Sequence, residues 1–435
     1  MPRAGEAAET MQVYLLSALA ALVGGRVGSV PGLRLLWWVL PTGVLVLLAA
    51  GRGEEVGTDT SMYHRFFREV APNSLADSLE RIPQEAGYVT LMYVVRQFTG
   101  DFQVFLLLCS LLTVVPVLMA IRRASSMPVL SLFLYIALSY YLLSFNGIRQ
   151  SIAVSLVLLA ETHRRSSRLT WLLLHLLALS FHISVLPVFL LILAARWQSA
   201  RPGRLLALVL GASAMGAALF GVPVVGRVLS LLNSRYDEYL STEEGAGLGT
   251  VLVLAVHVVI AVWLILSIRA AQARAEEDRA PYSETLLREF TAIYLLSCGI
   301  LVLATSNWVV GRLEPYFGIF AILALPHALT AARPRHALGL LAALVLAASV
   351  HFAFHTSRYN ELLPYELGAA AIAGGSEAGA HSGTEAAAGA LAQGTEETGA
   401  VVPAIGGAPA RAEPPASPEP LPEVVLSARA AGRSL

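Results

Sequence analysis

The sequence contains no lysine, and all 30 of its basic residues are arginine. Charged residues make up 14% of the 435-residue chain, well below the roughly 25% of a soluble domain. The formal net charge is zero, so the chain has no overall electrostatic attraction to nucleic acid or to acidic partners. Only two cysteines occur, Cys109 and Cys298, and both lie in apolar runs. We interpret them as buried hydrophobic residues rather than a disulfide or a metal site.

Several catalytic motifs are also absent from the sequence. Without a Walker loop, an ATP-driven pump is excluded. No Cys/His cluster and no H-E-x-x-H pattern indicates zinc, and no G-x-S-x-G elbow indicates a serine hydrolase. A D-x-D pair for a metal-bound nucleotide sugar is missing as well. We therefore expect neither a metal nor a cofactor.

Long hydrophobic runs are what the chain does contain. Hydrophobic residues make up 56% of it, with a mean hydropathy of +0.65. A helix needs about 20 apolar residues to cross the hydrocarbon core, and many runs reach or approach this length. We predict an all-α, polytopic bundle of roughly 10–12 transmembrane spans within residues 1–366. The expected spans are 11–25, 33–50, 102–120, 127–145, 148–161, 169–180, 183–195, 205–220, 250–268, 289–304, 313–330 and 337–353.

Two segments do not follow this pattern. Residues 87–98 are amphipathic, which favours a helix in the membrane interface. Residues 367–435 are rich in Ala, Gly, Pro and Glu, and such a composition cannot bury a core. We expect a disordered tail there, and no internal repeat is visible.

Arginine clusters alternate with arginine-poor loops and so predict the orientation of the spans. On this basis the clusters are cytoplasmic and the loops between them are external. The clusters are Arg122–Arg123, Arg164–Arg168, Arg196–Arg204, Arg269–Arg279 and Arg333–Arg335. The loops expected outside are 51–101, the bend at 146, the turn at 181–182, 221–249, 305–312 and the residues from 354 onward.

Unusual polar residues gather on the predicted external side. Asn146 and Gly147 form a bend inside "LLSFNGIRQSIAVSL", and Arg149 and Gln150 begin the next span. An arginine near the bilayer centre costs about 2.5–3.5 kcal/mol, which favours a functional reason for keeping it, although an arginine near a helix end can also snorkel. The other polar residues on this side are Asp59, Tyr63, Glu85, Tyr88, His182, Arg235, Tyr236, Tyr239, Asn307, Arg312, Glu314, Tyr316, Arg358, Asn360 and Tyr365.

Each of these residues also has a plain structural explanation. A lone histidine such as His182 is often a hydrogen-bonded structural residue. Asp59 and Glu85 would be ordinary solvated carboxylates of an external loop, and the tyrosines would be interfacial anchors. What favours a site is that so many polar residues share one side, where a water-filled cavity is expected.

The order of these motifs resembles the EpsG family of Wzy-like exopolysaccharide polymerases. The pattern Asn-x-x-Arg-Gln-x-x-Ala is matched by Asn146, Arg149, Gln150 and Ala153, and Phe-His-x-Ser is matched from Phe181 to Ser184. The preceding "QEAGY" has alanine after Glu85, where the family pattern has proline. The looser matches are "RYDEYL", "RLEPYF" and "YNELLPYE".

The resemblance implies a membrane glycosyltransferase in the bacterial cytoplasmic (inner) membrane. It would join oligosaccharide repeat units, carried on polyprenyl diphosphate at the outer leaflet, into exopolysaccharide. Its substrate would be the lipid-linked oligosaccharide, with a chain-length regulator and a flippase as further partners. No cofactor would be needed, because the diphosphate is itself the leaving group.

The residues found suit that chemistry. Arg149 and Arg312 would bind the departing diphosphate, since a guanidinium contacts phosphate oxygens in a bidentate manner. His182 is the first choice for the base that activates the acceptor hydroxyl, with Asp59 and Glu85 as alternatives. Substrate binding is expected from Asn146, Gln150, Tyr63, Tyr236, Tyr316 and Arg358.

Two other functions remain open. One is an enzyme of similar architecture, either an O-antigen-type ligase or a polyprenyl-phosphate-dependent glycosyltransferase. The other is a transporter or flippase of lipid-linked sugars. A transporter is expected to have inverted repeats and paired broken helices, and the sequence shows no such internal symmetry.

Overall fold

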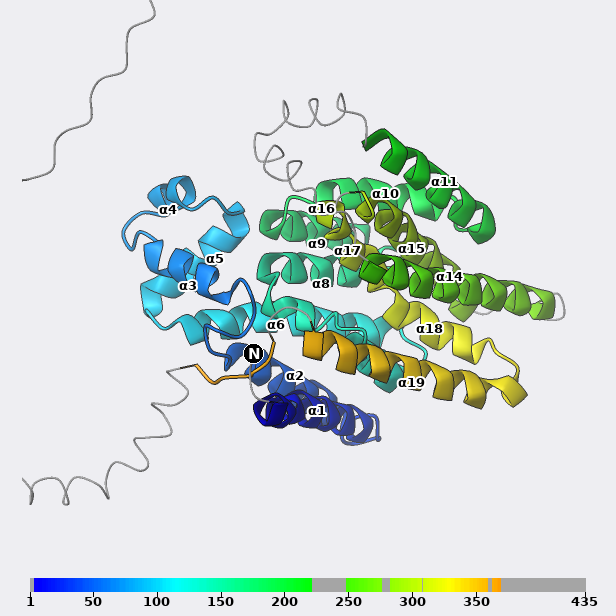
Figure 1. The fold of residues 1–435 in the computed structure, drawn as a ribbon, viewed down its shortest axis with the longest axis horizontal. Helices are drawn as coiled ribbons and strands as arrows, with labels where there is room; N and C mark the ends of the chain where they lie inside the picture. The colour runs from blue at the N-terminus through cyan, green and yellow to red at the C-terminus, as the bar shows by residue number, and fades with distance from the viewer. Residues whose placement is uncertain (1–3, 221–247, 276–281, 307, 359–361, 369–435) are drawn as a thin grey trace, which may run out of the picture. The chain divides into compact units, whose positions relative to one another are not determined.

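The computed structural model describes residues 4–220, 248–275, 282–306, 308–358 and 362–368, and they form helices joined by turns (Figure 1). Within these ranges the β contacts are limited to an isolated bridge between Arg52 and Leu367. The predicted all-α bundle is therefore confirmed. Residues 369–435, which make up nearly all of the expected tail, lie outside the described residues.

Within each described range, the helices follow one another with short connections. In order they are α1 (Ala4–Val27), α2 (Arg34–Ala50), α3 (Thr60–Glu69), α4 (Leu75–Arg81), α5 (Ala86–Phe98), α6 (Phe102–Ala124), α7 (Pro128–Ala137), the 3-10 helix η1 (Leu142–Phe145), α8 (Ile148–His163), α9 (Arg168–Phe181), α10 (Val185–Trp197), α11 (Pro202–Phe220), α14 (Leu248–Ala275), α15 (Tyr282–Ala304), α16 (Trp308–Gly311), α17 (Glu314–Gly318), α18 (Ala321–Thr330) and α19 (Pro334–Arg358). The amphipathic stretch 87–98 coincides with α5.

Four of the described helices are long and apolar enough to cross a membrane, or five if a bent pair is counted as one span. They are Phe102–Ala124, Thr250–Ala273, Glu284–Ala304 and Arg335–Ser357, with Val309–Gly318 and Ala321–Thr330 as the bent pair. Other expected spans are shorter helices, including Arg168–Phe181 and Val185–Trp197. A straight crossing takes about 20 residues.

Two of the expected spans, 127–145 and 313–330, are interrupted by breaks that the sequence analysis did not predict. After α7 the chain turns at Ser139, whose φ of 65° lies in the left-handed region that a right-handed helix cannot include. Near residue 319 the chain bends by 40° between α17 and α18. Apolar composition alone does not reveal such breaks, because the broken and unbroken forms are equally hydrophobic.

Helix α8 lies at the centre of the bundle. Every residue from Gln150 to Glu161 is buried, and α8 packs on both α6 and α9. The first turn of α6 is capped by Asp101, whose carboxylate accepts a hydrogen bond from the Gln103 amide at 2.8 Å. Arg122 and Arg123 stand in the last turn of α6, where cations interact favourably with the helix dipole.

The two ends of these helices carry different residues. At one end, Arg123 donates a hydrogen bond to the Thr162 carbonyl near the end of α8, at 3.1 Å. At the other end lie the start of α8 and the start of α6, where Phe102 stacks on His64. The bundle thus has an arginine-rich end and an opposite end, which holds the polar residues described next.

Candidate functional site

Glu85 precedes α5, and a close helix contact places it beside α9. A Cβ atom added at Gly87 would lie only 2.7 Å from the Ser180 carbonyl oxygen and closer still to the Ser180 hydroxyl. Glycine therefore lets α5 approach α9 more closely than any other residue would. Ser180 is two residues before His182, so this contact brings Glu85 to the turn that holds the histidine.

The Glu85 carboxylate links three segments that are distant in sequence. Arg149, in the first turn of α8, forms an ion pair with it. The backbone amide of Ile183 donates a hydrogen bond to it at 3.2 Å. His182 Nδ1 lies 3.9 Å from the same carboxylate oxygen. The sequence predicted Glu85, Arg149 and His182 on one side of the bundle, and the structure brings them together.

Ser184 fixes the tautomer of His182. The Ser184 backbone amide donates to Nδ1 at 3.3 Å, and the Ser184 hydroxyl is 2.8 Å from the same nitrogen. An amide nitrogen can only donate, so Nδ1 is the acceptor and the ring proton is on Nε2. Burial lowers the pKa of His182 to about 4, a change that Glu85 opposes and that Arg149 and Arg312 increase. His182 is accordingly a neutral imidazole that donates through Nε2.

Glu85 is the ionised partner of Arg149 and is therefore poorly suited to act as a general base. Burial by itself would raise the pKa of Glu85, but the positive charge of Arg149 and the contact with His182 lower it below its usual value. Both partners of the ion pair are largely covered, with 17% of the Glu85 and 21% of the Arg149 side chain exposed. Such shielding strengthens the attraction between the two charges.

The other side of Arg149 meets two tyrosines. Its guanidinium lies 6.0 Å from the centre of the Tyr88 ring, and Tyr88 packs edge-on against Tyr63. Burial raises the pKa of Tyr63 to about 12, while Arg149 lowers it and Asp59 raises it. Tyr63 is thus neutral, and the charges of Arg149 and Asp59 act on it in opposite directions. Asp59 itself is half-buried and precedes α3.

The remaining predicted residues come from α8 and the broken helix pair. Gln150 donates a hydrogen bond to the Arg312 carbonyl, which ties the start of α8 to the turn before α17. The Arg312 side chain is exposed, and its charge lowers the pKa of His182. Buried Tyr316 contacts the Ser184 hydroxyl at 3.1 Å, and Asn146 is buried at the bend before α8.

Two predicted residues are not placed at the site. Tyr236 lies outside the described residues, and Arg358 ends α19 with its side chain outside them as well. The prediction also missed the role of Ser184, although the sequence signal was present as the Ser two residues after His182. Glu314 was among the polar residues predicted on the external side, but its partners were missed. His257 Nε2, from α14, lies 3.1 Å from a Glu314 oxygen, and the Tyr140 hydroxyl lies 3.4 Å from the same oxygen.

A second group of buried charges occupies the arginine-rich end. Arg196 bridges Glu161 and Glu289, 2.6 Å from the latter. Glu161 also accepts a hydrogen bond from the Trp171 indole at 2.8 Å and lies 3.4 Å from His175. Each charged residue in this group contacts a residue of opposite charge. The contacts connect α8, α9, α10 and α15.

In the part of the chain that the structure describes, no group of three or more His, Cys, Asp or Glu side chains could hold a metal ion. The site is instead a buried ion pair with a neutral histidine and a second arginine nearby. Such a combination can bind an anion and stabilise negative charge that develops on it.

A family model described as the EpsG family matches residues 35–367. The chain belongs to the EpsG family. The matched region includes every described residue of the candidate site. EpsG-family membership, together with the apolar helices, identifies the chain as a multi-pass membrane protein of exopolysaccharide biosynthesis of the Wzy-like type. No curated protein and no solved structure matches the chain.

Proposed function

We propose that this EpsG-family protein polymerises oligosaccharide repeat units carried on polyprenyl diphosphate, at the external face of the bacterial cytoplasmic membrane. The observation that carries the proposal is the contact of Glu85 with both Arg149 and His182. The site lies at the end of the bundle opposite the arginine-rich loops, and such loops are normally cytoplasmic. An external site would meet repeat units after they have crossed the membrane.

In the proposed reaction, a hydroxyl oxygen of the acceptor sugar forms a bond to the anomeric carbon of the donor. The bond from that carbon to the diphosphate oxygen breaks, and the diphosphate leaves with the electron pair. Arg149 and Arg312 would bind the departing diphosphate. Donors aimed at developing charge in a water-poor site typically stabilise the transition state by a few kcal/mol each.

His182 takes a different role from the general base first expected. Its Nδ1 accepts from Ser184 and its proton is on Nε2, so in this form it donates to an oxyanion. A neutral donor adds a hydrogen bond to the diphosphate without placing a third full positive charge in the buried site. We propose His182 as a catalytic donor to the leaving group and Ser184 as its positioning residue.

Asp59 is the base that this arrangement leaves. Glu85 is held by Arg149, which lowers its pKa and makes it a weak proton acceptor. Asp59 is half-buried and acts electrostatically on Tyr63, as Arg149 does. It would accept the proton of the acceptor hydroxyl as the new glycosidic bond forms, which is a step worth about 10²–10⁴-fold in rate.

One observation favours a second function, transport of lipid-linked sugars. The break between α7 and η1 and the break between α16 and α18 lie side by side, because Tyr140 from the first contacts Glu314 from the second at 3.4 Å. Paired broken helices are typical of transporters. A ligase or a polyprenyl-phosphate-dependent glycosyltransferase would share the site residues and differ in its acceptor or donor.

Reconstitution of the purified protein in vesicles with lipid-linked repeat units distinguishes these functions. A ladder of longer lipid-linked chains, with release of polyprenyl diphosphate, is the expected result. Movement of the repeat unit across the bilayer without chain growth would instead identify a transporter. Transfer of a single unit to a different acceptor would identify a ligase.

A further inference from the structure

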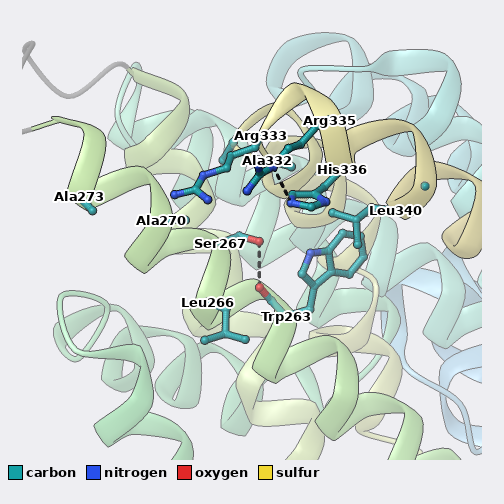
Figure 2. Close-up of a pocket in the computed structure, with 12 residues that line it drawn as sticks. Trp263, Leu266, Ser267, Ala270, Ala273, Ala332, Arg333, Arg335, His336 and Leu340 are labelled. Carbon is teal, nitrogen blue, oxygen red and sulfur yellow. Dashed lines mark hydrogen bonds between the residues drawn. The ribbon is translucent and has the colours of Figure 1, made fainter.

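A large pocket lies at the arginine-rich end, between α14 and the start of α19. Its volume is about 760 Å³, within the range of sites that hold small molecules. Figure 2 shows its lining, in which Arg333 and Arg335 extend from the beginning of α19 toward α14. The pocket belongs to no part of the site formed by Glu85, Arg149 and His182, which lies at the opposite end of the helices.

The rim of the pocket is strongly basic. Arg333 and Arg335 are both exposed, and no carboxylate among the described residues forms an ion pair with either of them. Arg335 Nε donates to His336 at 3.0 Å, which orients its guanidinium. The carboxylates described on nearby α15 are already used, since Glu284 pairs with Arg288 and Glu289 pairs with other arginines.

The wall of the pocket is apolar. Trp263 and Leu266 line it from α14, and Leu340 lines it from α19. Small residues keep it open, and a Cβ atom added at Gly339 would meet nothing within 4 Å. A basic rim above an apolar wall, between two membrane-spanning helices, matches a lipid in both its parts: the phosphate group and the acyl chain.

We propose that this pocket binds one anionic phospholipid, with the phosphate between Arg333 and Arg335 and an acyl chain along Trp263, Leu266 and Leu340. The positive charge of the rim favours an anionic lipid over a zwitterionic one. Two guanidinium groups without described carboxylate partners attract a net negative headgroup, while they repel the ammonium of a zwitterionic one. The site is separate from the proposed polymerase site and would hold in a transporter as well.

Native mass spectrometry of the full-length protein, with added phosphatidylglycerol or phosphatidylethanolamine, tests the proposal. We expect one phosphatidylglycerol to be retained at activation energies that remove phosphatidylethanolamine. Two independent variants should each weaken this retention at least tenfold. Arg333→Gln with Arg335→Gln removes the charge, and Gly339→Leu adds a side chain to the pocket at a position where a Cβ atom meets nothing within 4 Å.

Arg201→Gln with Arg204→Gln is the matched control, because it removes two exposed arginines at the start of α11, at the same end but outside the pocket. Equal loss of lipid in this control would overturn the proposal, since retention would then reflect total charge alone. Equal retention of phosphatidylethanolamine, or displacement of phosphatidylglycerol by millimolar inorganic phosphate, would also overturn it. Thermal stability of each variant without added lipid shows that the fold is intact.

Discussion

At the scale of single residues, Arg149 pairs with Glu85 in the structure and would also bind a diphosphate in the proposed reaction. A lysine could still carry the charge, but it lacks the planar fork that contacts two oxygens at once. The Arg149→Lys variant therefore separates charge from geometry.

We predict that Arg149→Lys loses at least tenfold in polymer formed from purified lipid-linked repeat units. A factor of ten corresponds to about 1.4 kcal/mol in the barrier. The matched control is Arg165→Lys, which alters an arginine paired with Glu289 at the opposite end and should keep wild-type turnover. Turnover by Arg149→Lys equal to that of the control, at matched protein level, would contradict diphosphate binding by Arg149.

His182 gives a prediction about pH. Its pKa in the folded protein is about 4, below the ordinary value of about 6.5. Between these two pH values the unfolded chain binds more protons than the folded chain, so the stability of the fold decreases as the pH falls. The stability present above pH 6.5 is lost progressively toward pH 4, by on the order of 3 kcal/mol at most.

Replacing the histidine should remove this part of the pH dependence. We predict that His182→Gln has a smaller drop in melting temperature than the wild type between pH 7 and pH 4.5. The measurement is thermal unfolding in detergent at a series of pH values. Parallel curves for the two proteins would mean that the pKa of His182 is the same in the folded and unfolded chains, and this would contradict the lowering of the pKa by burial.

At the scale of helices, the contact between α5 and α9 controls the position of Glu85. We predict that Gly87→Ala costs about 1–3 kcal/mol, as overpacking does, because the new methyl group would overlap Ser180. It should also lower polymer formation at least tenfold by moving Glu85 away from His182. Thermal unfolding and the polymerisation assay measure the two effects.

Gly43→Ala, in α2, is the control for that variant. A Cβ atom there meets nothing within 4 Å, and alanine is a better helix former than glycine by about 1 kcal/mol. Gly43→Ala should therefore be neutral or stabilising, with full activity. A stable and active Gly87→Ala would show that the spacing of α5 and α9 is not critical.

The helices also show what the sequence could and could not predict. Composition predicted the helical bundle. The polar residues around the bend before α8 indicated residues that the structure brings together in the candidate site. The breaks at Ser139 and near residue 319 were missed, because they depend on backbone geometry and tertiary contacts that hydropathy does not encode. The pair of His257 and Glu314 was missed for a related reason, since nothing in either local sequence indicates the other residue.

At the scale of the whole molecule, the last described residues are tied to the first helices. Tyr14 donates to the Leu362 carbonyl at 2.8 Å, and Tyr365 donates to the Leu48 carbonyl at 2.8 Å. The Gly368 amide donates to Gly51 at 2.9 Å. These bonds make residues 362–368 part of the helical bundle, and the Ala/Gly/Pro/Glu-rich residues begin after them.

We predict that a chain ending after Gly368 keeps full polymer synthesis, whereas one ending after Arg358 loses it together with thermal stability. The longer truncation removes the bonds to Tyr14 and to the end of α2. Normal stability of the protein ending after Arg358 would show that these bonds are dispensable. Loss of activity in the protein ending after Gly368, at a normal level in the membrane, would assign a role to the tail.

The proposed orientation in the membrane predicts a labelling pattern. Asn73→Cys lies in an exposed turn of the segment 51–101, which is predicted to be external, and Ser166→Cys lies in an exposed turn at the arginine-rich end. The native cysteines, Cys109 and Cys298, are buried and free, so they should give little background. In intact cells we expect a membrane-impermeant thiol reagent to label Asn73→Cys and not Ser166→Cys. The reverse pattern would place the site on the cytoplasmic side.

The buried charges at the two ends of α8 have a consequence for the order in which the protein is made. Arg149 meets a partner, Glu85, that precedes it in the chain, but Glu161 depends on Arg196, which follows it. Arg196 in turn is held by Glu289, which is made later still. A charge without its partner is expensive in the bilayer, so we expect α8 to reach its final position only after α10 has been synthesised. Glu289 then finds Arg196 already in place when α15 follows.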